Sequence, residues 1–117
     1  MSTKLGQASE KRAVEYLNAE GFFCIQTNYR GHRLGEIDII GLDGDVLCFI
    51  EVKFRKNNSY GEPVDFVTPA KCNKIILTAQ HYLCANEIYL NYECRFDVVN
   101  ILGDQIEWIK NAFELEG

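Results

Sequence analysis

The dipeptide Asp43-Gly44, which separates two apolar segments, is the feature that most restricts what this chain can fold into. Residues 36–42 and 46–55 are rich in β-branched and aromatic side chains, as strands are. Asp-Gly between two such segments is a strong signal for a two-residue β-hairpin turn, because both residues tolerate positive φ. The chain is therefore expected to be organised around an antiparallel hairpin.

The register of this hairpin predicts that charged residues of both strands share one face. With Asp43-Gly44 as the turn, Asp38 faces Phe49 and Glu36 faces Glu51. Paired residues share a face, and so do residues two apart along a strand. A three-residue turn would instead move Asp38 to the other face. With the two-residue turn, four charged residues project together: Glu36, Asp38, Glu51 and Lys53. The opposite face of the third strand is apolar and predicted to be core: Val46, Cys48, Ile50, Val52 and Phe54.

The other segments complete an α/β pattern. Apolar periodicity predicts a helix over 4–20 and a second helix from an N-cap at Thr68-Pro69 to about residue 86. Strands are expected at 22–30, 36–42, 46–55, 93–102 and 105–110, with a loop at 56–67. A helical crossover between the third and fourth strands favours parallel pairing there. The expected fold is one domain of residues 1–117 with a mixed central sheet flanked by helices.

The charges of the hairpin fit a metal-dependent hydrolytic site. Converging carboxylates form the hard-oxygen environment that Mg²⁺ or Mn²⁺ prefers. Lys53, two residues from Glu51, could neutralise negative charge that develops on a phosphodiester. Glu10 could complete the site if the first helix packs across this face. The alternative is a solvated strand face on which Glu51 pairs with Lys53 at the surface.

The spacing of Asp38 and Glu51-Val52-Lys53 resembles the PD-(D/E)XK signature of the restriction-endonuclease-like superfamily, whose core is αβββαβ. Over residues 5–113 the chain also resembles the YraN-like family of uncharacterised bacterial proteins, which is similar to archaeal Holliday-junction resolvases. The matching segments are Leu5-Gly6 with Glu10, Asn28-Tyr29-Arg30, Gly35 to Asp38, Asp43 to Asp45, Phe49 to Lys53 with Arg55, Lys71, Arg95 to Val99, and Trp108 with Asn111 to Phe113.

This resemblance implies a nuclease-like domain with metal ligands Asp38, Glu51 and Glu10, and with Lys53 as the catalytic lysine. The implied cofactor is Mg²⁺ or Mn²⁺. The implied activity is endonucleolytic cleavage of structured or branched DNA, in repair or recombination. The chain departs from the family pattern at Ser9, where glycine is usual, and at Phe54, where threonine is common, and neither change removes a chemical group.

The charge distribution is compatible with a DNA partner although the net charge is −5. Residues 1–74 hold ten Lys/Arg and ten Asp/Glu, so that all the excess acid lies in residues 75–117. Arg and Lys side chains of the N-terminal part are candidates for phosphate contacts. The four selected are Arg30, Arg33, Arg55 and Lys71. A homodimer is expected, because symmetric cleavage of two strands needs two sites.

Two alternatives to an enzyme remain open at this point. One is a catalytically silent nucleic-acid-binding module, and the other is a protein-interaction domain that uses the acidic C-terminal third. Asp97, in mid-strand, is interpreted as a structural partner of Arg95 or of a backbone amide. The chain shows neither a signal-peptide pattern at residues 1–4 nor an apolar run of membrane-spanning length, so a cytoplasmic protein without membrane contact is expected.

Overall fold

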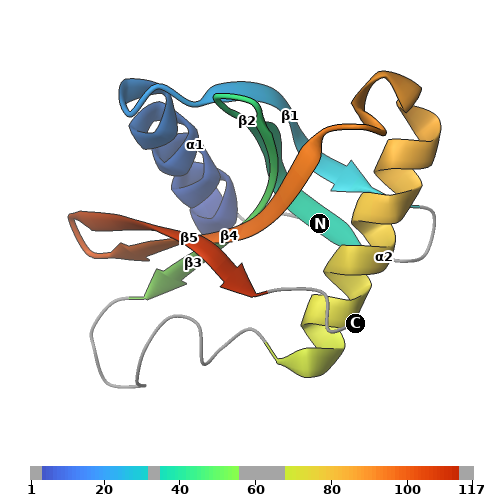
Figure 1. Cartoon of the computed structure of the whole chain (residues 1–117). Coiled ribbons are helices and arrows are strands. Elements are labelled where there is room, and N and C mark those ends of the chain that lie inside the picture. Colours follow the sequence, from blue (N-terminus) through green and yellow to red (C-terminus); the bar gives the residue numbers. More distant parts are fainter. Residues whose placement is uncertain (1–3, 32–34, 56–67, 114–117) are drawn as a thin grey trace.

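A computed structural model describes residues 4–31, 35–55 and 68–113, and the order of its elements is the one expected (Figure 1). The elements are α1 (Lys4–Ala19), β1 (Phe23–Arg30), β2 (Glu36–Asp43), β3 (Val46–Arg55), α2 (Pro69–Ala85), the short 3₁₀ helix η2 (Glu87–Tyr89), β4 (Glu93–Leu102) and β5 (Gln105–Phe113). The five strands form one sheet in sequence order, with β3 and β4 parallel and the other pairs antiparallel. The predicted α/β fold, a mixed sheet flanked by helices and compatible with an αβββαβ core, is confirmed.

Each helix covers one face of the sheet and encloses its own apolar core (Figure 1). On the α1 side, Leu17 packs with Cys48 and Ile50 of β3, so the predicted apolar face of this strand is confirmed. On the α2 side, Tyr82 packs with Leu47 and Phe49, the alternate residues of the same strand. Since β3 is central and covered twice, its first half is buried on both faces, and charged side chains enter it only from position 51 onward.

The ends of several elements follow from local chemistry. The Thr68 side chain accepts a 3.2 Å hydrogen bond from the Lys71 amide, and Pro69 opens α2, so the predicted N-cap is confirmed. Strand β5 runs to Phe113, beyond the predicted end at residue 110, and the Phe113 ring stacks on Phe96 at 5.2 Å. The loop expected at 56–67 lies outside the described residues. None of the described helices has the length and apolar character needed to cross a bilayer.

The hairpin is present, but the predicted turn and register are wrong. The turn residues are Gly44 and Asp45, and Asp43 pairs with Val46. Gly44 has a φ of 61°, the sign that a type II′ turn requires at its first central residue. The pairing is therefore displaced by two residues, and Phe49 pairs with Ile40 instead of Asp38. The last pair before the strands separate is Ile39 with Ile50.

A second departure occurs where β1 and β2 pass Asn28 and Asp38. Ile37 belongs to the core on the α2 side, whereas Ile39 belongs to the core on the α1 side. Residues two apart in a regular strand share a face, so the alternation breaks at Asp38. The pairing of β1 with β2 passes over Asn28, whose φ of 54° is left-handed. This local distortion lies directly beside Asp38, whose side chain approaches Glu10 of α1.

Candidate functional site

An open pocket of about 380 Å³ lies where β2 and β3 separate. The pairing of these strands ends at Ile39 with Ile50, and beyond it β3 continues toward Arg55 without β2. Residues of α1, β2, β3 and α2 line the pocket: Gly6, Ser9, Glu10, Asp38, Glu51, Val52, Lys53, Phe54 and Lys71. The structure thus brings together all four residues expected to be catalytic, with Lys71 beside them.

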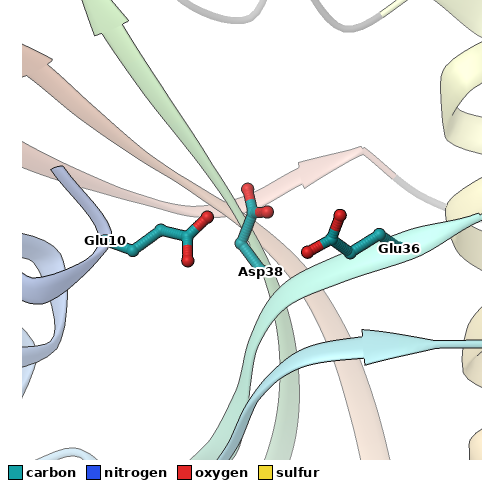
Figure 2. Close-up of side chains that lie close together, drawn as sticks. All are labelled: Glu10, Glu36 and Asp38. Carbon is teal, nitrogen blue, oxygen red and sulfur yellow. The ribbon is translucent and has the colours of Figure 1, made fainter. Parts of the chain in front are cut away.

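Three carboxylates converge at one side of this pocket. One oxygen each of Glu10, Glu36 and Asp38 lies within 4.8 Å of the others. Figure 2 shows Glu10 reaching from α1 toward Asp38, with Glu36 approaching from the opposite side on β2. Glu36 had no role assigned from the sequence, although its two-residue spacing from Asp38 was the available signal. Glu51, expected as a metal ligand, lies in the pocket but outside this carboxylate cluster of Glu10, Glu36 and Asp38.

Two acids of the carboxylate cluster, Asp38 and Glu10, bind protons more tightly than isolated acids would. Burial, followed by the charge of Glu51, raises the pKa of Asp38 from 3.8 to about 8. A 2.8 Å hydrogen bond from the Val52 amide to Asp38 Oδ2 opposes this rise. Burial also raises the pKa of Glu10, and the charges of Glu36 and Glu51 add to the effect, while contact with Asn28 lowers it. Close unneutralised carboxylates are the kind of environment that a cation stabilises.

Glu51 is paired with two lysines on the α2 side of the sheet. Its Oε1 lies 2.6 Å from Lys71 Nζ and 3.6 Å from Lys53 Nζ. Glu51 is only 6% exposed, so the alternative of a solvated strand face is wrong for this residue. Burial and the neighbouring Lys71 lower the pKa of Lys53. Burial also acts to lower the pKa of Lys71, but its contacts with Glu51 outweigh that effect and the pKa is raised.

The predicted common face of the four hairpin charges is therefore wrong. Glu51 and Lys53 follow Phe49 on the α2 side, whereas Glu36 and Asp38 approach Glu10 of α1. Asp38, Glu51 and Lys53 still line one pocket because the sheet is open at this point and Asp38 lies at the gap, hydrogen-bonded across it to β3. Glu36 meets Asp38 and Glu10 in the carboxylate cluster. Convergence thus comes from strand separation and not from a shared strand face.

The residues selected for DNA contacts have different positions. Arg30 is exposed at the end of β1, where it pairs with Glu36, one strand from the pocket. Arg55 ends β3 two residues after Lys53, and its carbonyl accepts a 3.3 Å hydrogen bond from the Gly103 amide. Lys71 lines the pocket, and Arg33 lies outside the described residues.

Asp97 lies outside the pocket and has a structural environment. It is fully buried and accepts hydrogen bonds from Arg95 Nε at 2.9 Å and Arg95 Nη2 at 2.9 Å. Trp108 Nε1 and the Asn111 amide donate further bonds at 2.8 Å each. The interpretation of Asp97 as a partner of Arg95 or a backbone amide is confirmed on both counts.

Comparison with known proteins shows that the sequence of this chain is similar, over almost its whole length, to members of one protein family. A model of the uncharacterised protein family UPF0102 matches residues 9–101. A UPF0102 protein of Coxiella burnetii is 44% identical over 117 residues, which cover 99% of this chain and 97% of the relative. UPF0102 proteins of Nitrosococcus oceani (44% over 115 residues, 95% and 92% covered) and Francisella tularensis (38% over 110 residues, 94% of each chain) are also similar.

Proposed function

The chain belongs to the uncharacterised protein family UPF0102, and we propose that it is a divalent-cation-dependent endonuclease acting on structured or branched DNA. The observation that carries the proposal is the pocket in which Glu10, Asp38, Glu51 and Lys53 meet. The resemblance to the restriction-endonuclease-like superfamily and to Holliday-junction resolvases supports the same reading. The biological setting that we propose is DNA repair or recombination.

The donor set of the pocket fits Mg²⁺ or Mn²⁺. Both cations prefer carboxylate oxygens, and the oxygens of Glu10, Glu36 and Asp38 are close enough together for one ion to be shared. Burial first, and then neighbouring carboxylates, raise the pKa of Asp38 and of Glu10, and a bound cation would favour the charged form of both. These three residues would hold the cation, with Glu51 as a further ligand. When bound, the cation would polarise a phosphoryl oxygen and lower the pKa of a coordinated water.

The chain's own cations would act on the substrate. Lys53 borders the pocket 3.6 Å from Glu51, where its ammonium group can stabilise negative charge that develops on the phosphate. Arg30, Arg33 and Arg55 would hold the DNA backbone by charge and bidentate bonds, without reading sequence. A homodimer would supply two such pockets for two strands.

A cleavage assay with matched variants tests this function. The wild-type protein, Asp38→Asn and the control Asp104→Asn, in an exposed turn, are incubated with four-way junction, flapped and single-stranded DNA in Mg²⁺ or Mn²⁺. We expect wild type and Asp104→Asn to cleave and Asp38→Asn to be inactive. Equal cleavage by Asp38→Asn would refute the proposal. Salt-sensitive binding without cleavage would instead favour a nucleic-acid-binding module.

A further inference from the structure

The contact between Glu51 and Lys71 sets the position of one acid in the pocket. Lys71 Nζ is 2.6 Å from Glu51 Oε1, a full ångström closer than Lys53 Nζ at 3.6 Å. Lys71 comes from α2, on the opposite side of the sheet from α1, which supplies Glu10. The closer of the two ion pairs therefore holds Glu51 on the α2 side, to which it projects after Phe49 of the same strand.

The carboxylate cluster forms without Glu51 although Glu51 lines the same pocket. The three oxygens within 4.8 Å of one another belong to Glu10, Glu36 and Asp38. Glu51 is buried, and a buried carboxylate requires a charged or hydrogen-bonding partner. A lysine and a cation are alternative partners for that requirement. Whichever holds Glu51 reduces its availability to the other.

We propose that Lys71 is a positioning residue that holds Glu51 away from the carboxylate cluster and competes with a divalent cation for it. This inference rests on the proposed function, because it takes Glu51 as a cation ligand. Competition is reciprocal: an anion that draws Lys71 away strengthens cation binding, and a bound cation releases Lys71 for an anion. A phosphodiester backbone is such an anion, so the pair couples occupation of the cation site to arrival of substrate.

Calorimetric titration with Mn²⁺ in the absence of DNA tests the competition. Lys71→Met should bind Mn²⁺ about three- to tenfold more tightly than wild type, because Glu51 is released. Lys71→Arg, which keeps the charge and the capacity to pair, should stay near the wild-type affinity. The control is Lys74→Met, one turn along α2 and exposed, which should leave the affinity unchanged.

A double-mutant cycle separates competition for Glu51 from a general loss of positive charge. In a Glu51→Gln background, Lys71→Met should no longer tighten Mn²⁺ binding, whereas a purely electrostatic effect would persist. The inference is overturned if Lys71→Met binds no more tightly than wild type, if its gain survives in Glu51→Gln, or if Lys74→Met gives the same gain. If one of these results is obtained while the wild-type protein still binds Mn²⁺ and cleaves DNA, the proposed function stands. Absence of Mn²⁺ binding in wild type and every variant would overturn both.

Discussion

Val52 and Asp38 are joined across the gap between β3 and β2 by a 2.8 Å hydrogen bond from the Val52 amide to Asp38 Oδ2. The bond lies just beyond the last pair of the hairpin, Ile39 with Ile50. It fixes a carboxylate at the point where the strands separate, and it places Glu51, the residue before Val52, near that carboxylate. Asp38 is therefore both a backbone partner and the most strongly perturbed acid described here, with a pKa of about 8.

Asp38→Asn is expected to stabilise the protein in the absence of metal at alkaline pH while abolishing cation binding. The asparagine can still accept the Val52 hydrogen bond, but it adds no charge beside Glu10, Glu36 and Glu51. Thermal unfolding in a chelating buffer checks this, and each kcal/mol gained would raise Tm by about 4 °C in a chain of this length. A lower Tm for Asp38→Asn than for wild type would show that the carboxylate stabilises the metal-free fold.

The raised pKa of Asp38 also predicts the pH dependence of stability. The unfolded chain releases this proton near 3.8, whereas the folded protein retains it up to about 8. Rising pH therefore favours the unfolded state across this window, and the contribution becomes constant above it. Urea unfolding of wild type and Asp38→Asn at pH values from about 5 to about 9 should show a free-energy difference that widens up to about pH 8. A difference independent of pH would contradict the shift.

Lys53→Met is expected to reduce DNA cleavage by about 10²- to 10³-fold, because a cation that stabilises developing phosphate charge is removed. Mn²⁺ binding should be retained, since the oxygen ligands come from the carboxylate cluster and Lys53 supplies none of them. Single-turnover cleavage and calorimetry on the same preparation separate the two effects. Lys110→Met, a lysine of β5 paired with Asp43 outside the pocket, serves as the control and should cleave normally.

Asp97→Ala is expected to destabilise the fold by about 3–5 kcal/mol, the range for breaking a buried ion pair by removing one partner. It would leave Arg95, Trp108 and the Asn111 amide without their shared acceptor. Urea unfolding measures the loss. The folded fraction should still bind Mn²⁺ with wild-type affinity, because Asp97 lies outside the pocket. A specific loss of Mn²⁺ binding with unchanged stability would show that Asp97 has a functional role instead.

Gly41→Ala is expected to be strongly destabilising, at about 3 kcal/mol or more. A Cβ at this position would come within 2.3 Å of the Phe23 carbonyl oxygen and 2.4 Å of the Phe22 ring, so backbone would have to move. Gly103→Ala is the matched comparison, since its Cβ would meet no atom within 4 Å and its φ of 58° adds only strain of about 1–2 kcal/mol. Equal losses of unfolding free energy in the two variants would show that crowding at Gly41 is relieved cheaply.

The sequence by itself determined the kinds of element, their order and the two apolar layers. The alternation in residues 46–55 and the helical spacing around Leu17 and Tyr82 are local patterns that survive in the folded protein. It also predicted the meeting of Glu10, Asp38, Glu51 and Lys53, although partly through resemblance to a known family. Such patterns are readable because side-chain direction repeats with the period of a helix or strand.

The tertiary structure alone decided the register, the face of each acid and the pairing of Glu51. A displacement of two residues leaves strand alternation unchanged, so the apolar pattern could not distinguish a turn at Asp43-Gly44 from one at Gly44-Asp45. Asp38 meets Glu10 only because α1 packs against the sheet beside it, and no neighbouring residue in sequence signals this contact. Lys71 reaches Glu51 only because α2 packs across the sheet after a long crossover. Contacts between residues distant in sequence depend on packing, for which local periodicity carries no information.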